Sequence, residues 1–156
     1  MVKASASLDA SQLVPMQVHH LAEISHIHQD IDPSPWSLQQ WTSCCGNPLY
    51  QNWVVLQSDS VIAFACYISS GEELELLNIG VERSWQGQGI GEAMLKSSFL
   101  LLPESAEQCF LEVRRSNIPA ISLYKKLGFE QISERKDYYR HSSGVIEDAL
   151  IFRKSL

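Results

Sequence analysis

Long apolar stretches are missing from this sequence. No run approaches the roughly 18 apolar residues from which a membrane-spanning helix is built. The first seven residues also lack an apolar core of signal-peptide length. We therefore expect no membrane segment and a cytoplasmic location.

Cysteine is scarce as well. The four cysteines are Cys44, Cys45, Cys66 and Cys109, and no two of them have the C-x-x-C spacing. Adjacent cysteines such as Cys44 and Cys45 do not easily bridge each other, so we expect four free thiols in a reducing compartment. A catalytic cysteine stays open as an alternative.

Basic residues are too few to balance the acidic ones. Lysine and arginine number 12 against 18 aspartates and glutamates, which gives a formal net charge of −6. A general nucleic-acid binder needs a basic face, so this balance argues against direct nucleic-acid binding. The acidic surface fits a cationic substrate, and it fits equally a surface that only keeps the protein in solution.

Metal-binding patterns are absent too. The histidines His19, His20, His26 and His28 lie in or near one predicted helix, with spacings that match no zinc site. We predict surface positions for these histidines and no metal.

The length of 156 residues suits one domain with its own core, and no repeat or linker interrupts it. Residues 1–11 are rich in Ser and Ala and predict a disordered segment before a domain over residues 12–156. Apolar periodicity and turn residues predict the elements. The predicted strands cover residues 13–16, 53–56, 61–68, 74–81, 109–113, 129–133 and 145–152, and the predicted helices cover residues 18–29, 37–45, 92–102 and 117–127. This order predicts an α/β (α+β) fold with one mixed central sheet and helices on both faces.

A glycine-rich stretch from Gln86 to Gly91 joins the predicted strand at 74–81 to the predicted helix at 92–102. Its glycines allow a tight turn, and the free N–H groups of the new helix point into that turn. Together these features predict an anion site suited to phosphate. A P-loop needs Lys after the last glycine, and a dinucleotide fingerprint needs Gly or Ala three places after Gly89. Glu92 stands at both places, so the spacing excludes both types of loop.

The spacing Gln-x-x-Gly-x-Gly resembles the pyrophosphate loop of the acyl-CoA-dependent N-acetyltransferases, the GNAT superfamily. Further motifs fall in register with the bacterial ribosomal-protein-alanine N-acetyltransferases, which acetylate the N-terminal alanine of a small-subunit ribosomal protein. These motifs are Leu76–Val81, Leu111–Arg114, Ser116–Asn117, Ala120–Ile121, Leu123–Tyr124, Leu127–Phe129, Tyr138–Tyr139 and Glu147–Ala149, with Pro35–Ser37 earlier in the chain. The resemblance covers roughly residues 74–152 and implies a single-domain GNAT-type fold.

The resemblance implies acetyl-CoA as the cofactor. Main-chain groups of Ile79, Gly80 and Val81 would bind its pantetheine arm like an added strand. The residues implied for its pyrophosphate are Gln86, Gly87, Gln88, Gly89, Ile90, Gly91 and Glu92. Asn117 would hydrogen-bond the cofactor, cap its own helix, or do both.

Gly80 and the pair Arg114–Arg115 need separate comment. Gly80 stands where the resemblance implies Ala, and we expect it to loosen its strand and mark a bulge. Arg114 and Arg115 could meet the cofactor's phosphates, but we predict a solvated pair.

The resemblance assigns the catalytic roles to Glu112 and Tyr124. Glu112 would act as the general base through a water molecule, and the Tyr124 hydroxyl would act as the general acid at the cofactor sulfur. An α-amine has a pKa of about 7.7–8.0, so roughly a tenth of it is neutral at pH 7 and a weak base suffices. From the residues alone, Glu112 could instead be a buried strand carboxylate, and Tyr124 a core tyrosine with a satisfied hydroxyl.

The acceptor site would be walled by Trp36, Tyr138 and Tyr139, unless these aromatic residues only pack on the sheet. The predicted function is direct acetyl transfer from acetyl-CoA to a primary amine, with the N-terminal alanine of a ribosomal protein as the acceptor. The same chemistry on a lysine, a polyamine or another small amine is one alternative. A non-catalytic acyl-CoA-binding sensor is another, against which the presence of both Glu112 and Tyr124 argues.

Overall fold

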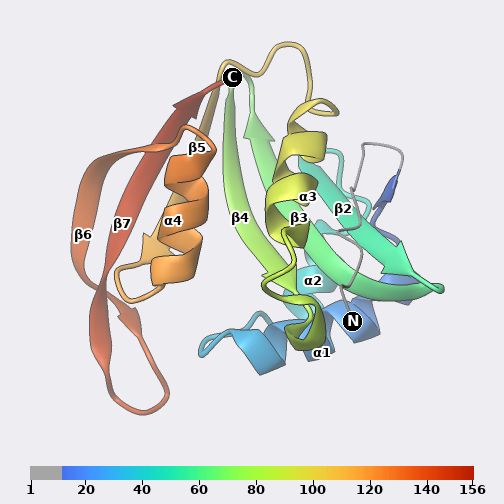
Figure 1. Cartoon of the computed structure of the whole chain (residues 1–156), viewed down its shortest axis with the longest axis horizontal. Coiled ribbons are helices and arrows are strands. Elements are labelled where there is room, and N and C mark those ends of the chain that lie inside the picture. The colour runs from blue at the N-terminus through green and yellow to red at the C-terminus, as the bar shows by residue number, and fades with distance from the viewer. Residues whose placement is uncertain (1–11) are drawn as a thin grey trace.

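The computed structural model describes residues 12–156, so the predicted disorder of residues 1–11 lies outside the described residues. A seven-stranded sheet runs through the molecule in the order β1-β2-β3-β4-β5-β7-β6, with helices on both faces (Figure 1). Neighbouring strands are antiparallel except β4 and β5, which are parallel. The mixed sheet predicted from the sequence is confirmed.

The strands are β1 (Leu13–Pro15), β2 (Tyr50–Gln57), β3 (Ser60–Ser70), β4 (Glu73–Val81), β5 (Gln108–Arg114), β6 (Glu130–Arg140) and β7 (Ile146–Ser155). The α-helices are α1 (Leu21–Ile31), α2 (Leu38–Cys44), α3 (Ile90–Phe99) and α4 (Ile118–Lys126). Short 3-10 helices, η2 (Val18–His20) and η3 (Arg83–Trp85), precede α1 and α3.

The longest departure from the predicted elements is β6. The apolar pattern predicts a strand that ends at residue 133, whereas β6 continues to Arg140. β6 lies at the edge of the sheet with nearly all of its side chains exposed, so it has no apolar alternation that would reveal its length. This extension carries Tyr138 and Tyr139 onto a strand.

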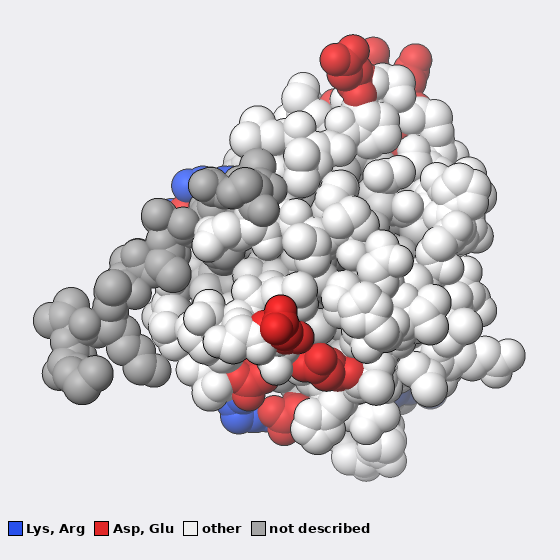
Figure 2. All heavy atoms as spheres, turned by 90° about the vertical axis from the view of Figure 1, so that its right-hand side faces the viewer, with Lys and Arg blue, Asp and Glu red and all other residues white. Residues whose placement is uncertain are grey.

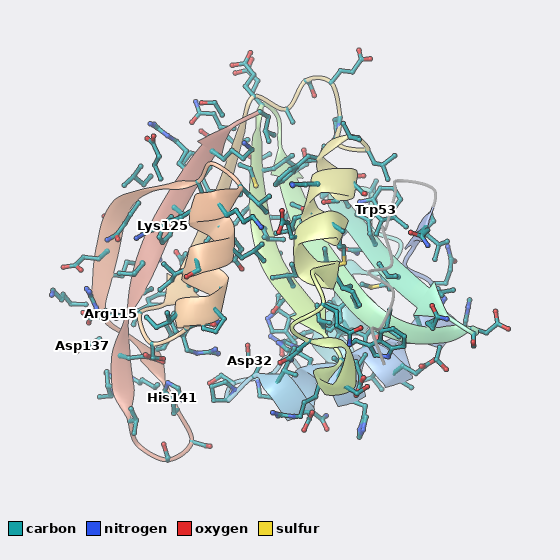
Figure 3. All side chains as sticks on the ribbon, in the orientation of Figure 1. Asp32, Trp53, Arg115, Lys125, Asp137 and His141 are labelled. Carbon is teal, nitrogen blue, oxygen red and sulfur yellow. The ribbon has the colours of Figure 1, made fainter. Side chains whose placement is uncertain are left out.

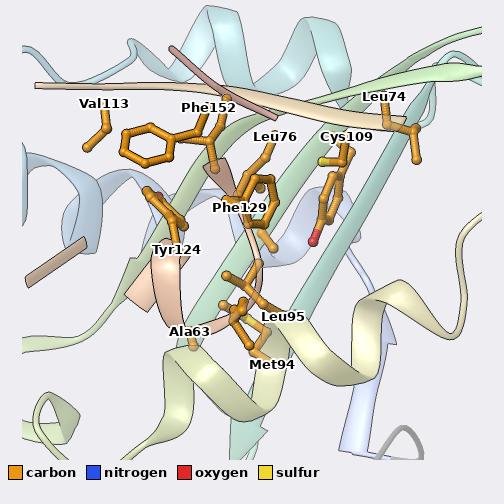
Figure 4. Packing of buried hydrophobic residues seen from close by; sticks show 14 of the residues in the cluster. Ala63, Leu74, Leu76, Met94, Leu95, Cys109, Val113, Tyr124, Phe129 and Phe152 are labelled. Atoms are coloured by element: carbon orange, nitrogen blue, oxygen red, sulfur yellow. The ribbon is translucent and has the colours of Figure 1, made fainter. Parts of the chain in front are cut away.

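The larger apolar cluster lies between the sheet and helices α3 and α4. Met94 and Leu95 of α3 and Tyr124 of α4 pack with Leu76 and Phe152 of the sheet (Figure 4). All five side chains are buried. This packing fixes α4, and with it Tyr124, against the middle strands.

A second cluster joins helices α1 and α2 to the opposite face of the sheet. Ile24 of α1 and Trp41 of α2 are fully buried with Phe64 of β3. The Ser37 hydroxyl accepts a hydrogen bond from the Gln40 N–H (3.2 Å) and caps α2, as the sequence predicts. The loop between α1 and α2 is thereby held at the rim of the sheet.

The prediction of surface histidines is wrong for His20 and His28, which are both buried. The Gln17 N–H donates to His20 Nδ1 (3.0 Å), and the Trp36 N–H donates to His28 Nδ1 (3.2 Å). Each ring is therefore buried with a hydrogen-bond partner for its Nδ1 atom. Spacing along the sequence does not reveal such partners.

Strands β4 and β5 separate halfway along their length. Their pairing ends at Leu76–Leu111, although β4 continues to Val81 and β5 to Arg114. At the same level the register with β3 shifts and leaves Leu77 as an extra residue in β4. Such a bulge bends a strand, so β4 turns away from β5 and the sheet opens.

Gly80 does not mark this bulge, so that expectation is wrong. It pairs in register with Phe64, three residues beyond Leu77. A Cβ atom at this position would lie 2.6 Å from Phe64 Cε1 and 2.8 Å from Ile31 Cδ1. Close packing, rather than a bulge, accounts for the glycine.

The face of the molecule shown in Figure 2 is uncharged over most of its area. Asp and Glu side chains gather at its upper end and in its lower part, while Lys and Arg show only at its rim (Figure 2). Within residues 12–156, no helix combines the length and the apolar character needed to cross a membrane.

Candidate active site

The opening between β4 and β5 borders a cavity of about 710 Å³ on the α3 and α4 side of the sheet. Ile79, Gly80 and Val81 of β4 line one wall, as the cofactor assignment requires. The glycine loop and the start of α3 line its end, with Gln86, Gly87, Gly89, Ile90, Gly91 and Glu92. We call this cavity the cofactor cleft.

The glycine loop has the geometry of an anion cradle. Gly89 is the N-cap of α3 in the left-handed conformation (φ +78°), which only glycine adopts without strain. A Cβ atom at Gly87 or Gly89 would meet nothing within 4 Å, so the space in front of the loop is open. The first N–H groups of α3 face this space and suit a phosphate. The cleft therefore fits the pyrophosphate of the implied cofactor.

The two glutamine side chains of the loop hold the backbone in place. Gln86 Nε2 donates to the Val81 carbonyl (2.9 Å), and Gln88 Nε2 donates to the Ser84 carbonyl (3.1 Å). Gln88 is the one residue of the predicted pyrophosphate set that does not line the cleft.

A second cavity of about 290 Å³, which we call the acceptor cavity, adjoins the cleft. Ile79, Asn117 and Tyr124 line both cavities, so the two spaces meet at these side chains. Trp36 from the α1–α2 loop and Tyr138 and Tyr139 from β6 line the acceptor cavity. All three residues predicted for the acceptor site are thereby brought together.

Tyr124 stands at the junction of the two cavities. Burial raises the pKa of its hydroxyl, as does the neighbouring Tyr139, so the hydroxyl keeps its proton. The hydroxyl has no hydrogen-bond partner within residues 12–156. It is therefore free to donate to a bound molecule.

Asn117 is the N-cap of α4. Its side-chain oxygen accepts a hydrogen bond from the Ala120 N–H (3.3 Å). The capping role is thus confirmed, and the residue also lines both cavities.

Glu112 lines the acceptor cavity just beyond Leu111, the last residue of β5 that pairs with β4. Arg135 Nη1 of β6 lies 3.2 Å from Glu112 Oε1, and the Arg135 side chain is about half exposed (54%). Glu75 of β4 lines the same cavity, and burial and the Glu112 charge raise its pKa. With Asp32, three acidic side chains line this small cavity, which favours a cationic acceptor.

Asp32 and Arg114 also line the acceptor cavity. The prediction that Arg114 and Arg115 form a solvated pair is wrong for Arg114. Its side chain is mostly buried (13% exposed) and donates to Asp32 of the α1–α2 loop. The Arg114 guanidinium also lies over the Tyr139 ring, 4.9 Å from its centre. Asp32 lies at the end of α1, on the side that faces strands β6 and β7 (Figure 3).

This ion pair is part of a longer chain of contacts. His28 Nε2 lies 3.4 Å from Asp32 Oδ2, and Arg114 Nε lies 4.0 Å from Glu147 Oε1. His141 Nε2 in turn lies 2.8 Å from the same Glu147 oxygen. The chain fixes the two walls of the acceptor cavity relative to each other.

Sequence reasoning missed five polar residues of this cavity: Asp32, Ser34, Glu75, Asn78 and Arg114. Asn78 is the most unusual, because its side-chain nitrogen is buried and has no partner within the described residues. Asn78 and Arg114 lie inside the quoted motifs Leu76–Val81 and Leu111–Arg114, which is the only signal that could have found them. Arg115, by contrast, is half exposed and pairs with Glu134.

Comparison with known proteins agrees with this geometry. The model of the acetyltransferase (GNAT) family matches residues 16–129. A relative from Escherichia coli (strain K12), named [ribosomal protein bS18]-alanine N-acetyltransferase, is 37% identical over 127 residues, which cover 81% of this chain and 84% of that protein. A relative of the same name from Haemophilus influenzae is 34% identical over 126 residues, 80% of this chain and 85% of its own length.

Solved structures show the same fold. The crystal structure of the Escherichia coli ribosomal-protein-alanine N-acetyltransferase matches with a TM-score of 0.85 and 33% identity, over 92% of each chain. Arabidopsis thaliana NAA60 in complex with acetyl-CoA matches in fold, with a TM-score of 0.83 at 19% identity over 92% of this chain and 97% of that one. The chain belongs to the acetyltransferase (GNAT) family.

Proposed function

We propose that this protein transfers the acetyl group of acetyl-CoA to the α-amine of an N-terminal alanine, on a ribosomal protein in the cytoplasm. The observation that carries the proposal is the meeting of two cavities at Tyr124 and Asn117, with Glu112 on the acceptor side. The names of the relatives support the choice of acceptor.

The proposed roles follow from where each group lies. Acetyl-CoA, when bound, supplies an acetyl thioester. Main-chain groups of Ile79, Gly80 and Val81 orient it along the open edge of β4, and the glycine loop binds its pyrophosphate. The amide of Asn117 adds a hydrogen bond while its oxygen caps α4.

Glu112 takes a proton from the acceptor amine, through a water molecule. Tyr124 Oη donates a proton to the departing sulfur, a role for which a protonated hydroxyl free of protein partners is suited. Trp36, Tyr138 and Tyr139 wall the acceptor backbone. Glu75 adds a second carboxyl group beside Glu112, and an ammonium group bound there would favour its charged form.

The first test measures CoA release with three acceptors. One is a peptide with a free N-terminal alanine, one is the same peptide blocked at its N-terminus and carrying lysine, and one is a polyamine. We expect turnover on the free alanine peptide alone. Turnover only on the blocked peptide or the polyamine would remove the N-terminal acceptor and leave a general amine acetyltransferase.

The second test removes the proposed catalytic groups. We expect Glu112→Gln and Tyr124→Phe each to lower kcat by about 10²–10⁴, which is the usual contribution of a general acid or base. Acetyl-CoA binding, measured by calorimetry, should stay unchanged in both variants. A double variant that keeps a substantial rate would contradict these roles. An active wild type, together with a double variant that binds acetyl-CoA without turnover, would favour an enzyme over a sensor.

A further inference from the structure

The cofactor cleft is poor in positive charge. Acetyl-CoA carries a pyrophosphate and a further phosphate on its ribose, yet the glycine loop from Gln86 to Gly91 contains no Lys or Arg. Among the described residues that line the cleft, Lys126 is the only cation and Glu92 the only anion. The charges of Lys126 and Glu92 therefore cancel, and the side chains that line the cleft carry no net charge.

Lys126 and Glu92 form a direct ion pair across the cleft. Lys126 Nζ, at the end of α4, lies 2.6 Å from Glu92 Oε2, in the first turn of α3. The other oxygen of Glu92 pairs with Lys96 Nζ at 2.8 Å. These two lysines lower the pKa of Glu92, with the Lys126 hydrogen bond as the largest cause. One carboxylate thus holds two ammonium groups.

We propose that Lys126 binds the pyrophosphate of acetyl-CoA and that Glu92 holds its ammonium group in place beside the glycine loop. The inference rests on the proposed cofactor. It deepens that function by giving the pyrophosphate a positively charged partner from α4. The glycine loop, at the start of α3, offers only N–H groups.

The geometry favours Lys126 over the other lysines nearby. Glu92 follows Gly91 directly, so the carboxylate that holds Lys126 starts one residue from the loop. Lys96 shares Glu92 but lies one turn further along α3 and does not line the cleft. Lys125 precedes Lys126 on α4 and does not line it either (Figure 3). Because the Lys126 ammonium has three N–H donors, it can stay paired with Glu92 and still donate to a phosphate.

The test compares Lys126→Gln with the wild type in direct binding, measured by calorimetry at low ionic strength. The probes are acetyl-CoA, acetyl-dephospho-CoA, which keeps the pyrophosphate, and S-acetylpantetheine, which has no phosphate. We expect about 3- to 10-fold weaker binding of the first two probes, a modest loss because the Lys126 side chain is largely exposed. Binding of S-acetylpantetheine should stay unchanged, and the loss should shrink as salt is added.

Two matched variants act as controls. Lys125→Gln removes the same charge from the same helix, and Lys96→Gln removes the other partner of Glu92, so both should bind acetyl-CoA as the wild type does. An equal loss in Lys125→Gln would mean that only net charge matters and would overturn the inference. A loss in Lys126→Gln that vanishes with acetyl-dephospho-CoA would place the contact on the ribose phosphate and overturn it too.

The role of Lys126 can be wrong while the proposed function is right. If wild-type protein binds acetyl-CoA and Lys126→Gln binds it equally, only the role of Lys126 is wrong. If the wild type does not bind acetyl-CoA, the proposed function fails and the inference with it. Melting temperatures without ligand show whether Lys126→Gln is folded.

Discussion

A single missing side chain, at Gly80, lets α1 approach the cofactor cleft. Phe64 fills the place of the absent Cβ atom from one side, and Ile31 at the end of α1 fills it from the other. Ile31 and Gly80 both line the cleft. The absence of a Cβ atom at Gly80 therefore lets the end of α1 pack closely against β4.

We expect Gly80→Ala to destabilise the protein by about 1–3 kcal/mol, because the new methyl group overlaps Phe64 and Ile31 in a packed interior. Urea denaturation measures the loss. The double variant Gly80→Ala with Phe64→Leu should lose less than the sum of its two single changes.

Gly91→Ala is the matched control for Gly80→Ala. Its added Cβ would meet nothing closer than 3.6 Å, and it lies inside α3, where alanine is favoured by roughly 1 kcal/mol. Equal losses in the two variants would show that crowding at Phe64 is not the cause.

At the scale of elements, the ion pair between Asp32 and Arg114 joins the α1–α2 loop to β5. These residues lie 82 positions apart in the chain. Arg114 also contacts Tyr139 of β6 and Glu147 of β7, so one guanidinium connects both walls of the acceptor cavity. Burial alone would raise the pKa of Asp32, but hydrogen bonds from His28 and Ser34 and the Arg114 charge hold it at about 2.

This shift gives stability a definite pH dependence. Because the pKa of Asp32 is lower in the folded protein than in the unfolded chain, its charge stabilises the fold above about pH 4, and that contribution disappears as the pH falls towards 2. At pH 7 the contribution is about 2 kcal/mol. We expect Asp32→Asn to be less stable than the wild type by at least about this amount at pH 7, and by progressively less between about pH 4 and pH 2.

Urea denaturation of both proteins across this range measures the difference. Asp59→Asn is a suitable control, because Asp59 lies exposed in the β2–β3 turn and has no ion partner among the described residues. A stability difference for Asp32→Asn that does not change with pH would rule out the carboxylate charge as its source.

At the scale of the whole molecule, the seven strands form one sheet, but β4 and β5 separate in its middle. The two halves of the fold are joined by the β4–β5 pairing at one end of the opening and by the Asp32–Arg114 pair between the α1–α2 loop and β5. The cofactor cleft and the acceptor cavity border this opening and share three residues. A ligand that occupies the cleft therefore contacts both halves of the fold.

We expect acetyl-CoA at about 100 times its dissociation constant to stabilise the folded protein by roughly 2.7 kcal/mol, because it binds only the folded state. For a chain of this length, this corresponds to a rise in Tm of about 5–10 °C, measurable by thermal denaturation. S-acetylpantetheine at an equal concentration should raise Tm less, since it lacks the phosphates that the glycine loop faces. No change in Tm with saturating acetyl-CoA would contradict the assignment of the cleft.

The sequence by itself determined the order of strands and helices and the glycine loop with its phosphate chemistry. These depend on local rules: which residues turn the chain, cap a helix or alternate on a strand. The choice of Glu112 and Tyr124 came from the resemblance to a family, not from these rules. Only the tertiary structure decided that His28 is buried, that Arg114 pairs with Asp32, and that Lys126 reaches Glu92 across the cleft. Such contacts join residues far apart in the chain, and their partners are chosen by how helices pack on an opened sheet, which no local pattern encodes.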